Sequence, residues 1–429
     1  MERYTTFRNS GVELVPSIPS NWQSKPLKFI ADCNSRVLSE NTDEDVEIKY
    51  IDIGSVSYGQ GICGTQEFTF ANAPSRARRI VKSGDTIIST VRTYLKAIAY
   101  ISDEYDSNIC STGFAVYSPK NEVDSRFLFY ALNADWFVSD VERHSVGISY
   151  PAITSTALSS LKAILPPVEE QVKIVIWLDH RTAEIDSQLT DLQSQAKMLE
   201  RYKRELISET VIKGLDKSAL YKNSGVDWMD EIPVAWELFP LYAVAKENKV
   251  KNNGMICENL LSLSYGRIIQ KDIDSAFGLL PASFEGYQIV QPGYTVMRLT
   301  DLQNDKRSLR TGYVTETGII TSAYMGLIPG ERLDGKYFNF LLHAYDFLKI
   351  YYGLGSGLRQ TLNFSDMKRL PVLIPPLTEQ KVIVDYIDAK TTQINGLIAD
   401  INEQIEKLKQ YRQIVIHDAV TGKIKVTEG

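Results

Sequence analysis

The sequence repeats itself, and this duplication limits the folds open to the chain more than any other feature. The segment ILPPVEEQ, which ends at Gln171, recurs as LIPPLTEQ, which ends at Gln380, at an offset of 209 residues. A second pair, NSGVELVPSIPSNW ending at Trp22 and NSGVDWMDEIPVAW ending at Trp236, recurs at an offset of 214. Internal repeats indicate duplicated structural units. The sequence therefore predicts an A–B–A′–B′ architecture, with each A–B unit taking about half of the 429 residues.

Unit B is predicted to be a long amphipathic helix. Apolar residues recur at steps of mostly three and four from Val175 to Leu206, which is a heptad seam interrupted by one threonine. At about 1.5 Å per residue this stretch is roughly 47 Å long, and its seam needs a partner. The second copy is the expected partner, in antiparallel pairing. The seam positions, each repeated 209 residues later, are Val175, Leu178, Thr182, Ile185, Leu189, Leu192, Ala196, Leu199, Tyr202 and Leu206.

Unit A is predicted to be a mixed α/β domain. The segments VEIKYIDIGSV, RIVKSGDTIISTV and STGFAVYSP have the β-branched and aromatic content of strands between turn residues. The segment SRFLFYALNADWFVSDVER has helical spacing of its apolar residues and predicts one helix over residues 125–143. The second copy offers YQIVQPGYTVMRLT, TSAYMGLIPG and DGKYFNFLLHAYDFLKIYY in the same order.

Composition excludes several classes of protein. Four well-separated cysteines without a CxxC pair exclude a zinc ribbon and argue against a disulfide framework. The N-terminus lacks the apolar stretch of a signal peptide, so we expect a cytoplasmic protein with no membrane partner. The net charge of −6 argues mildly against nucleic acid as the sole partner. Basic loops can still act locally on an acidic chain.

Motifs for catalysis are weak or missing. The sequence has no Walker A motif, no GxSxG elbow, and no Asn/Asp-Pro-Pro-aromatic loop of an amino-methyltransferase. Glu47-Ile48-Lys49 resembles only the tail of a nuclease metal site. The four histidines are scattered without the spacing of metal ligands. We therefore expect a non-catalytic chain that binds neither a metal nor a cofactor itself.

Residues suited to nucleic acid occur in loops at matching places of the two A units. Residues 90–96 follow a predicted strand, and residues 298–310 are their counterpart; both mix cations with hydroxyl, amide or ring side chains that read base edges. Arginines at 76–79, including Arg79, suit phosphates. Glycine-containing segments at 147–150 and 353–360 precede the long helices. For any single residue, a solvated loop remains the alternative. The predicted DNA-binding residues are Arg76, Arg78, Arg92, Thr93, Tyr94, Lys96, Ser149, Tyr150, Arg298, Thr300, Asp301, Gln303, Asn304, Lys306, Arg307, Arg310, Ser356, Arg359 and Gln360.

The duplicated PPxxEQ segment, the heptad helix after it and the SGVxWxxxIPxxW start of each repeat together resemble the specificity (S) subunit of type I restriction–modification enzymes. The resemblance covers essentially the whole chain, and the order of the repeated parts is more distinctive than any single motif. The first repeat departs from the pattern at Leu14, where the second repeat has Trp228. This difference affects local packing only.

The resemblance implies a function and a set of partners. Each A unit would read one half of a split, asymmetric site in double-stranded DNA. The helices would set the distance between the halves and dock two modification (methyltransferase) subunits. S-adenosylmethionine, ATP and Mg would be held by these subunits and by restriction subunits, in a prokaryotic cytoplasm. We expect the dock on the charged outer face of the helices, which includes Lys173, Arg181, Arg201, Lys203 and Arg204.

The predicted fold class is α+β, with two similar target-recognition domains separated by two long helices that pair as an antiparallel coiled coil in a pseudo-two-fold repeat. The expected limits are 1–165 and 217–374 for the domains, 166–216 for the central helix and 375–429 for the C-terminal helix. A helix pair roughly 47 Å long would separate half-sites by more than one DNA turn of about 34–36 Å. A coiled-coil scaffold that binds no DNA, and an orphan specificity subunit of a related defence system, remain open alternatives.

Overall fold

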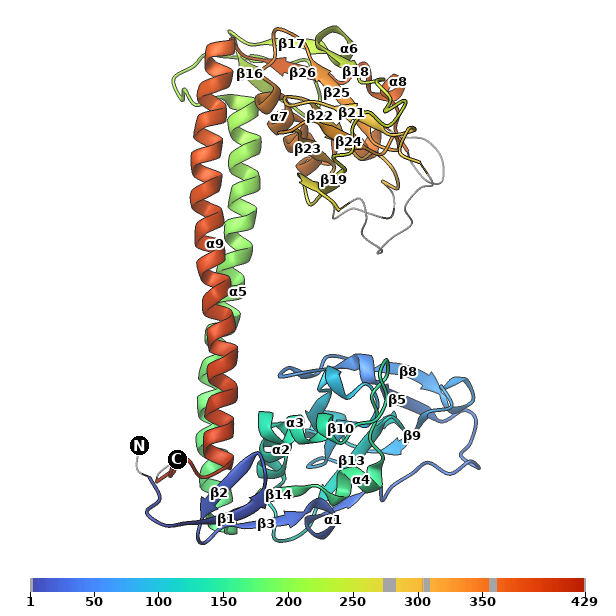
Figure 1. Cartoon of the computed structure of the whole chain (residues 1–429), viewed down its shortest axis with the longest axis vertical. Helices are drawn as coiled ribbons and strands as arrows, with labels where there is room; N and C mark the ends of the chain where they lie inside the picture. The colour runs from blue at the N-terminus through green and yellow to red at the C-terminus, as the bar shows by residue number, and fades with distance from the viewer. Residues whose placement is uncertain (1–2, 273–282, 303, 305–308, 355–360, 428–429) are drawn as a thin grey trace. The chain divides into compact units, whose positions relative to one another are not determined.

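The computed structural model describes residues 3–272, 283–302, 304, 309–354 and 361–427. The chain divides into two compact units, the first made of residues 1–192 and 403–429 and the second of residues 193–402. Each unit contains an α/β domain and a stretch of two long helices, α5 (Val168–Lys213) and α9 (Leu377–Val420) (Figure 1). Both helices extend beyond the seams that the heptad pattern predicts.

The domain of the first unit is built around antiparallel strands. One four-stranded sheet has the order β11-β10-β13-β4, and a second has the order β8-β5-β12-β9, in which β5 and β12 are parallel. Helix α2 packs against β10, β11 and β13. The elements are β1 (Phe7–Val12), β2 (Val15–Pro19), β3 (Gln23–Pro26), α1 (Leu27–Ile30), β4 (Ala31–Cys33), β5 (Glu47–Ile51), β6 (Val56–Ser57), β7 (Gly61–Ile62), β8 (Gln66–Thr69), β9 (Ala77–Ile80), β10 (Thr86–Ser89), β11 (Ile98–Tyr100), β12 (Ile109–Ser111), β13 (Phe114–Pro119), α2 (Ser125–Asn133), α3 (Asp135–Arg143), α4 (Ser155–Ser160) and β14 (Lys162–Leu165).

The helix predicted over residues 125–143 is in fact two helices. Asp124 caps α2 because its carboxylate accepts hydrogen bonds from the backbone N–H groups of Arg126 and Phe127. The helix ends at Ala134, which has extended backbone angles, and α3 begins at the next residue. The break allows Trp136 and Phe137, which are buried, to join the same core as α2. Tertiary packing thus overrides a helical pattern that continues through the sequence.

The domain of the second unit repeats the central sheet of the first. Its four-stranded sheet has the order β18-β25-β22-β23, which matches β4-β13-β10-β11 strand for strand. The two-stranded pairs β3–β14 and β17–β26 also match. The elements are β15 (Tyr221–Asn223), β16 (Glu231–Pro233), β17 (Glu237–Pro240), α6 (Leu241–Val244), β18 (Ala245–Glu247), β19 (Leu261–Ser264), β20 (Arg267–Gln270), β21 (Gln288–Val290), β22 (Thr295–Met297), β23 (Thr311–Tyr313), β24 (Gly318–Ile320), β25 (Met325–Pro329), α7 (Gly335–Phe347), α8 (Phe364–Met367) and β26 (Pro371–Ile374).

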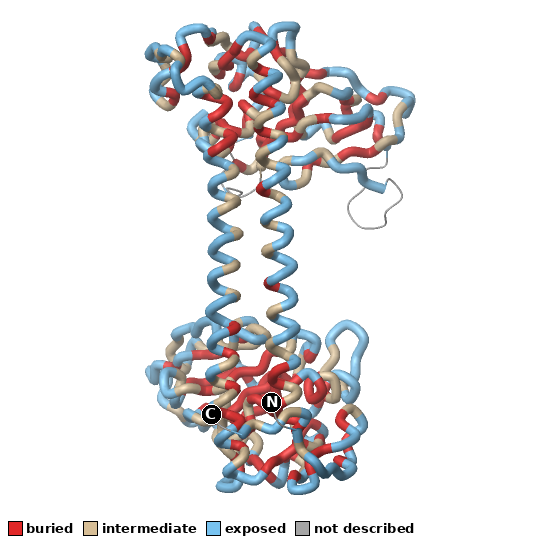
Figure 2. Tube along the Cα trace, turned by 90° about the vertical axis from the view of Figure 1, so that its left-hand side faces the viewer, coloured by how far each residue is buried: buried red, intermediate tan, exposed pale blue. Residues whose placement is uncertain are grey.

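Within each unit the stretches of α5 and α9 run antiparallel. In the first unit, Leu178 near the start of α5 shares a core with Ile416 near the end of α9. In the second unit, Val211 near the end of α5 shares a core with Ile383 near the start of α9. The middle part of both helices is largely exposed, as Figure 2 shows in pale blue. The arrangement confirms the predicted fold class of two mixed domains with paired long helices.

The seam differs from the prediction at one repeated position. The heptad pattern places Tyr202 and Tyr411 in the seam, but 52% and 41% of their surfaces are exposed. The seam position is taken in each copy by the next residue, Lys203 or Arg412. The heptad pattern is ambiguous here, because the aliphatic stem of a long cation can fill a seam as an apolar residue does. Lys203 is therefore not part of the outer charged face.

The cations in the seam have polar partners that are also related by the repeat. In the first unit, Arg412 donates to both carboxylate oxygens of Asp186, at 2.9 and 3.2 Å. In the second unit, Lys203 Nζ donates to Asn395 Oδ1 at 3.0 Å. Asp186 and Asn395 are 209 residues apart in the sequence, and so are Lys203 and Arg412. Among the described residues, no helix is long and apolar enough to cross a membrane.

Candidate nucleic-acid interface

In the first unit, the backbone ties the predicted DNA-binding segments into one row. The N–H of Thr112 donates to the carbonyl of Arg76 at 2.8 Å, and the N–H of Thr90 donates to the carbonyl of Gly113 at 2.7 Å. The N–H of Ile153 then donates to the carbonyl of Thr90 at 2.9 Å. The loops around Arg76, after β10 and before α4 therefore lie beside one another at one edge of the domain.

Arg92 and Tyr150 come together at this edge. Arg92 is exposed, has a positive φ of 51°, and places its guanidinium carbon 5.1 Å from the centre of the Tyr150 ring. Their loops are joined by a β-bridge between Val91 and Ala152. Stacking on an aromatic face holds the guanidinium while its N–H donors stay available. The pair is thus a pre-arranged set of donors and ring surface at the edge of the domain.

The other predicted residues of these two loops differ in exposure. Tyr94 and Ser149 are exposed, and Lys96 is partly buried with its Nζ 5.4 Å from the centre of the Tyr58 ring. Thr93, in contrast, is buried, and its hydroxyl donates to Ser145 Oγ at 2.9 Å. Its side chain is therefore unavailable to DNA in this conformation, and we withdraw Thr93 as a contact residue.

The arginines at 76–79 divide into outward and inward side chains. Arg76 is exposed, and Arg78 lies over the Phe70 ring, 4.8 Å from its centre. Arg79 points inward, where its guanidinium bonds Asn34 and the carbonyl of Phe114. Burial lowers the pKa of Arg79 from its ordinary value. Arg79 thus supports the β9 region from within and is not placed to hold a phosphate.

The second unit has the same tie between its two loops. The N–H of Leu362 donates to the carbonyl of Leu299 at 3.0 Å, and both residues stand 209 positions after the Ile153–Thr90 pair. In the loop after Leu299, Thr300 and Asp301 are partly exposed. The exposed Asn304 donates from Nδ2 to Asp301 Oδ1 at 2.8 Å. An amide and a carboxylate therefore stand where the first unit displays an arginine.

Arg310 does not display its side chain as predicted. It is fully buried, and its guanidinium donates to the carbonyl of Thr300 at 2.7 Å and to those of Arg298 and Asp301 at 3.4 Å. Asp346 accepts a hydrogen bond from its backbone N–H at 2.7 Å. We therefore withdraw Arg310 as a direct contact, because its cation holds the loop from inside. Its neighbour Arg298 is partly buried.

Six predicted residues have no structural outcome. They lie outside the described residues, and their roles stay predictions. They are Gln303, Lys306, Arg307, Ser356, Arg359 and Gln360.

The repeated sequence motifs fix the domains to the long helices. In the first unit, Trp22 Nε1 donates to Glu170 Oε2 at 2.8 Å, and in the second Trp236 Nε1 donates to Glu379 Oε2 at 3.0 Å. The following glutamine, which is buried in both copies, bonds the loop before the domain helix. Gln171 Oε1 accepts from the N–H of Asp124 at 2.8 Å, as Gln380 does from Asp334 at 2.7 Å. The PPxxEQ motif is thus a structural anchor.

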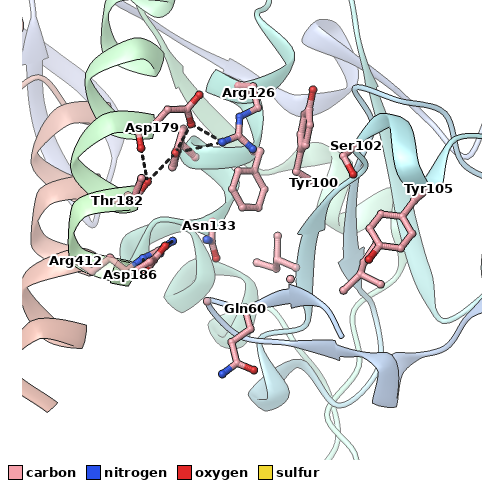
Figure 3. Close-up of a pocket in the computed structure, with 17 residues that line it drawn as sticks. Gln60, Tyr100, Ser102, Tyr105, Arg126, Asn133, Asp179, Thr182, Asp186 and Arg412 are labelled. Atoms are coloured by element: carbon pink, nitrogen blue, oxygen red, sulfur yellow. Dashed lines mark hydrogen bonds and ion pairs between the residues drawn. The ribbon is translucent and has the colours of Figure 1, made fainter. Parts of the chain in front are cut away.

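A second anchor lies about two turns further along each long helix. In the first unit, Asp179 of α5 pairs with Arg126 of α2 and accepts from Tyr130 Oη at 2.5 Å (Figure 3). In the second unit, Asp388 pairs with Lys336. Burial, reinforced by the bond to Asp179, raises the pKa of Tyr130 to about 12, so it stays a donor at neutral pH. In the first unit, the domain and the helix are thus held together by an ion pair and by the hydroxyl of Tyr130.

The first unit has a pocket of about 430 Å³ beside this anchor. It is lined by the tip of the β6–β7 hairpin, by β11 and α2, and by side chains of both long helices (Figure 3). Two of its buried polar atoms, Asn133 Oδ1 and Arg412 Nη1, have no hydrogen-bond partner. Among the described residues, no group of three His, Cys, Asp or Glu side chains could hold a metal ion.

Comparison with known proteins decides the family. The type I restriction modification DNA specificity domain matches residues 19–193 and 311–407, well over half of the chain. The chain belongs to this family. The putative type I restriction enzyme MjaX specificity subunit of Methanocaldococcus jannaschii is 23% identical over 441 residues, which cover 96% of each chain.

Solved structures share the fold of this specificity subunit. A chain described under "Structural basis underlying complex assembly and conformational transition of the type I R-M system" matches with a TM-score of 0.71 and 22% identity, covering 95% of this chain and 99% of that one. The HsdS subunit from Thermoanaerobacter tengcongensis matches with a TM-score of 0.50 and 21% identity, covering 95% and 98%. The predicted resemblance is confirmed, and the family assigns the chain to DNA sequence recognition and not to catalysis.

Sequence reasoning overlooked two prominent residues of this specificity subunit. Val146 and Ile148 flank Gly147 and are among the most exposed large apolar side chains, at 80% and 104%. The signal was present, because two β-branched apolar residues stand in a loop beside glycine without belonging to any periodic pattern.

Proposed function

We propose that each unit reads one half of a bipartite, asymmetric site in double-stranded DNA through the edge described above. The observation that supports this most is the repeated backbone tie, Thr90 to Ile153 and Leu299 to Leu362, with different side chains around it. A common backbone with different donors and acceptors suits two domains that read different sequences. The scaffold alternative gives no reason for exposed polar groups at matching edges.

The exposed side chains at the two edges support different readings. Arg92 offers the fork of donors that pairs with the O6 and N7 atoms of guanine. Asn304 offers the amide that pairs with adenine, once it releases Asp301. Arg76 is exposed at the same edge as Arg92 and suits a phosphate. We therefore expect a guanine contact in the half-site of the first unit.

An exchange of domains tests modular reading. Residues 1–165 are replaced by the matching domain of a relative, and the methylated sequence is mapped in the assembled complex. We expect one half of the methylated site to change and the other half to stay the same. The matched control exchanges residues 217–374, which should change only the other half. If either exchange altered both halves together, modular reading would be wrong.

The long helices are proposed to set the distance between the half-sites. Helix α5 has 46 residues and takes part in both units, as α9 does. One heptad inserted after Gln195, with a second after the equivalent Gln404, keeps the seam on one face. It lengthens each helix by about 10 Å, or about three base pairs.

The measurement is methylation of a DNA library whose half-sites are separated by random spacers of different lengths. We expect a preferred gap about three base pairs longer with unchanged half-sites. The single insertion after Gln195 is the comparison, and bending of the unmatched partner should reduce its effect to about one to three base pairs. An unchanged gap in a stable, assembled double-insertion complex would leave the helices a purely structural role.

The outer face of the helices is proposed to dock two methyltransferase subunits, which would bring S-adenosylmethionine. Restriction subunits would bring ATP hydrolysis and Mg-dependent cleavage. On α5, a hollow is lined by Ser194, Lys197, Met198, Glu200, Arg201 and Arg204, and 66% of Met198 is exposed. An exposed apolar side chain among three cations and one carboxylate suits a partner surface with acidic and apolar groups.

Co-purification with methyltransferase subunits tests the dock. Met198→Asp combined with Arg201→Glu should reduce assembly, because it removes apolar contact and reverses a charge in the hollow. Lys28→Glu, at an exposed position of the first domain, is the matched control. Undiminished assembly of the double variant would exclude this hollow as the dock. The predicted cations Lys173 and Arg181 can be tested in the same way.

A further inference from the structure

The loop at residues 146–150 of the first unit has a fixed shape but displays unpacked apolar side chains. Its ends are joined by paired backbone hydrogen bonds between Val146 and Ala152, at 2.8 and 3.0 Å. Gly147 has a φ of +117°, and a Cβ there would lie 3.1 Å from the carbonyl oxygen of Tyr150. The backbone turn, and not side-chain packing, therefore holds Ile148 outward, where it is fully exposed.

This apolar tip belongs to the candidate DNA edge. Tyr150, from the same loop, stacks under the Arg92 guanidinium, and the Val91–Ala152 bridge joins the loop to the segment after β10. Thr93 and Ser145 connect the same two loops through their hydroxyls. The same edge as Ile148 thus carries the Arg92 guanidinium stacked on the Tyr150 ring, and this cation attracts a polyanion. An aliphatic side chain beside such a group gains little from phosphates, and at base edges it can contact only the thymine methyl group.

We propose that Ile148 is a wedge that enters the base stack of the half-site read by the first unit. The proposal rests on the proposed function, because it takes duplex DNA as the partner. Proteins that insert an aliphatic side chain between base pairs unstack one step and kink the duplex. Arg92, stacked on Tyr150, would hold the adjacent base or phosphate while the wedge is in place. Pyrimidine–purine steps deform most easily, so the wedge selects TA or CA/TG at its position.

The sequence of the second unit has a related pair. Gly357-Leu358 stands 210 residues after Gly147-Ile148, again a glycine followed by an aliphatic residue. These two residues lie outside the described part of the chain. The proposal is therefore restricted to the first unit.

The test uses the full chain assembled with methyltransferase subunits and its methylated site, determined beforehand by sequencing. The base analogue 2-aminopurine is placed at successive positions of the half-site, where its fluorescence rises on unstacking. We expect a rise at one step other than the methylated base with the natural chain. Ile148→Ala should abolish that rise and weaken binding by about tenfold at a TA or CA/TG step. The salt dependence of binding should stay unchanged, because no phosphate contact is lost.

Controls separate the wedge from the other proposals. Ile256→Ala removes another exposed isoleucine, in the second unit, and should change neither fluorescence nor affinity. If Ile148→Ala lost co-purification with methyltransferase subunits, the tip would be a protein contact and the wedge would be wrong. If the variant bound its site with unchanged affinity and fluorescence, the wedge would also be wrong, while DNA reading would stand. If the natural complex showed no sequence preference, the proposed function itself would fail.

Discussion

The two units are alike where a domain joins a long helix and unlike where their loops face outward. Each unit has a tryptophan bonded to the glutamate of PPxxEQ, Trp22 to Glu170 and Trp236 to Glu379. Each has a buried glutamine after that glutamate that accepts from the loop before the domain helix. The sequence repeats are therefore contacts of the junction. The features shared by the two units are the contacts that attach each domain to a long helix.

At the outward edge, the arginine side chains of the two units are placed differently. In the first unit, Arg92 lies exposed on a tyrosine ring. In the second, Arg310 is buried and donates to backbone carbonyls, so that Asp301 and Asn304 are displayed in its place. An arginine in a polar loop can thus be exposed toward a partner, as we propose for Arg92 toward DNA, or can support the loop from inside, as Arg310 does. Burial distinguishes these roles.

The largest expected effect comes from breaking a shared junction. Trp22→Ala should destabilise the first unit, and Trp236→Ala the second, by about 3–5 kcal/mol each, because both rings are buried and leave cavities. Hydrogen exchange resolves which unit opens. Phe29→Ala, at a ring that is 64% exposed, is the control for the first unit and should cost little. Equal loss of protection in both units would show that the junctions are not independent.

The next largest effect separates the two arginines. Arg310→Ala should destabilise the second unit by about 1–3 kcal/mol, since three carbonyls lose their donor. Arg92→Ala should leave stability unchanged and reduce DNA affinity by about 1–3 kcal/mol, mainly at one base position. Thermal unfolding and binding to a set of site variants measure the two effects. A stable Arg310→Ala chain with altered specificity at a single base would reverse our assignment of that residue.

Much of the fold could be predicted from the sequence. The offset of 209 residues indicated the duplication, and the heptads indicated two long helices that pair through a seam, because these patterns follow directly from packing geometry. The domain between the two copies allows the chain to return, which favours antiparallel pairing. The break at Ala134 could not be predicted, since the apolar spacing continues through it and only the core requires two helices. The sequence also could not show that Lys203, and not Tyr202, occupies the seam, because this depends on Asn395 as a hydrogen-bond partner.

The candidate site was less predictable than the fold. The sequence indicated the loops that the backbone brings together. It could not show which of Arg92, Arg79 and Arg310 has an exposed side chain and which of them bonds groups inside its domain. That distinction depends on contacts with distant residues, such as the carbonyl of Phe114 for Arg79. Ile148 is not an obvious candidate in the sequence, because apolar residues usually lie in cores and its full exposure is set by the tertiary structure.

A smaller effect is expected from pH, through a histidine of the second unit. His343 of α7 is partly buried beside Lys203 and Arg204, and burial first, then these cations, lowers its pKa to about 4. The equivalent residue in the first unit is Asn133, at an offset of 210. Because the folded chain resists protonation of His343, the unfolded chain binds more protons below about pH 6.5. Stability of the second unit therefore falls as pH drops from about 6.5 to 4.

The variant His343→Gln isolates this contribution from that of the carboxylates. It should reduce the loss of stability between pH 7 and pH 4.5 by about 1–2 kcal/mol, given that one pKa unit corresponds to about 1.4 kcal/mol. Urea unfolding of both chains at each pH, monitored by hydrogen exchange of amides in the second unit, measures the difference in stability. An identical pH dependence of the His343→Gln chain would contradict the assignment.

The smallest effect would make the two seams alike. Asn395→Asp gives Lys203 a carboxylate partner, as Asp186 gives Arg412 in the first unit. The expected gain is below about 1 kcal/mol, because exposed ion pairs contribute little and Lys203 already pairs with Glu200 at 2.8 Å. Salt should reduce the gain, since screening acts on the new Coulomb attraction. Urea unfolding at low and high ionic strength measures it, with Asn395→Ala as the control that only removes the hydrogen bond. A gain that persisted unchanged at high salt would show that packing, and not charge, limits this position of the seam.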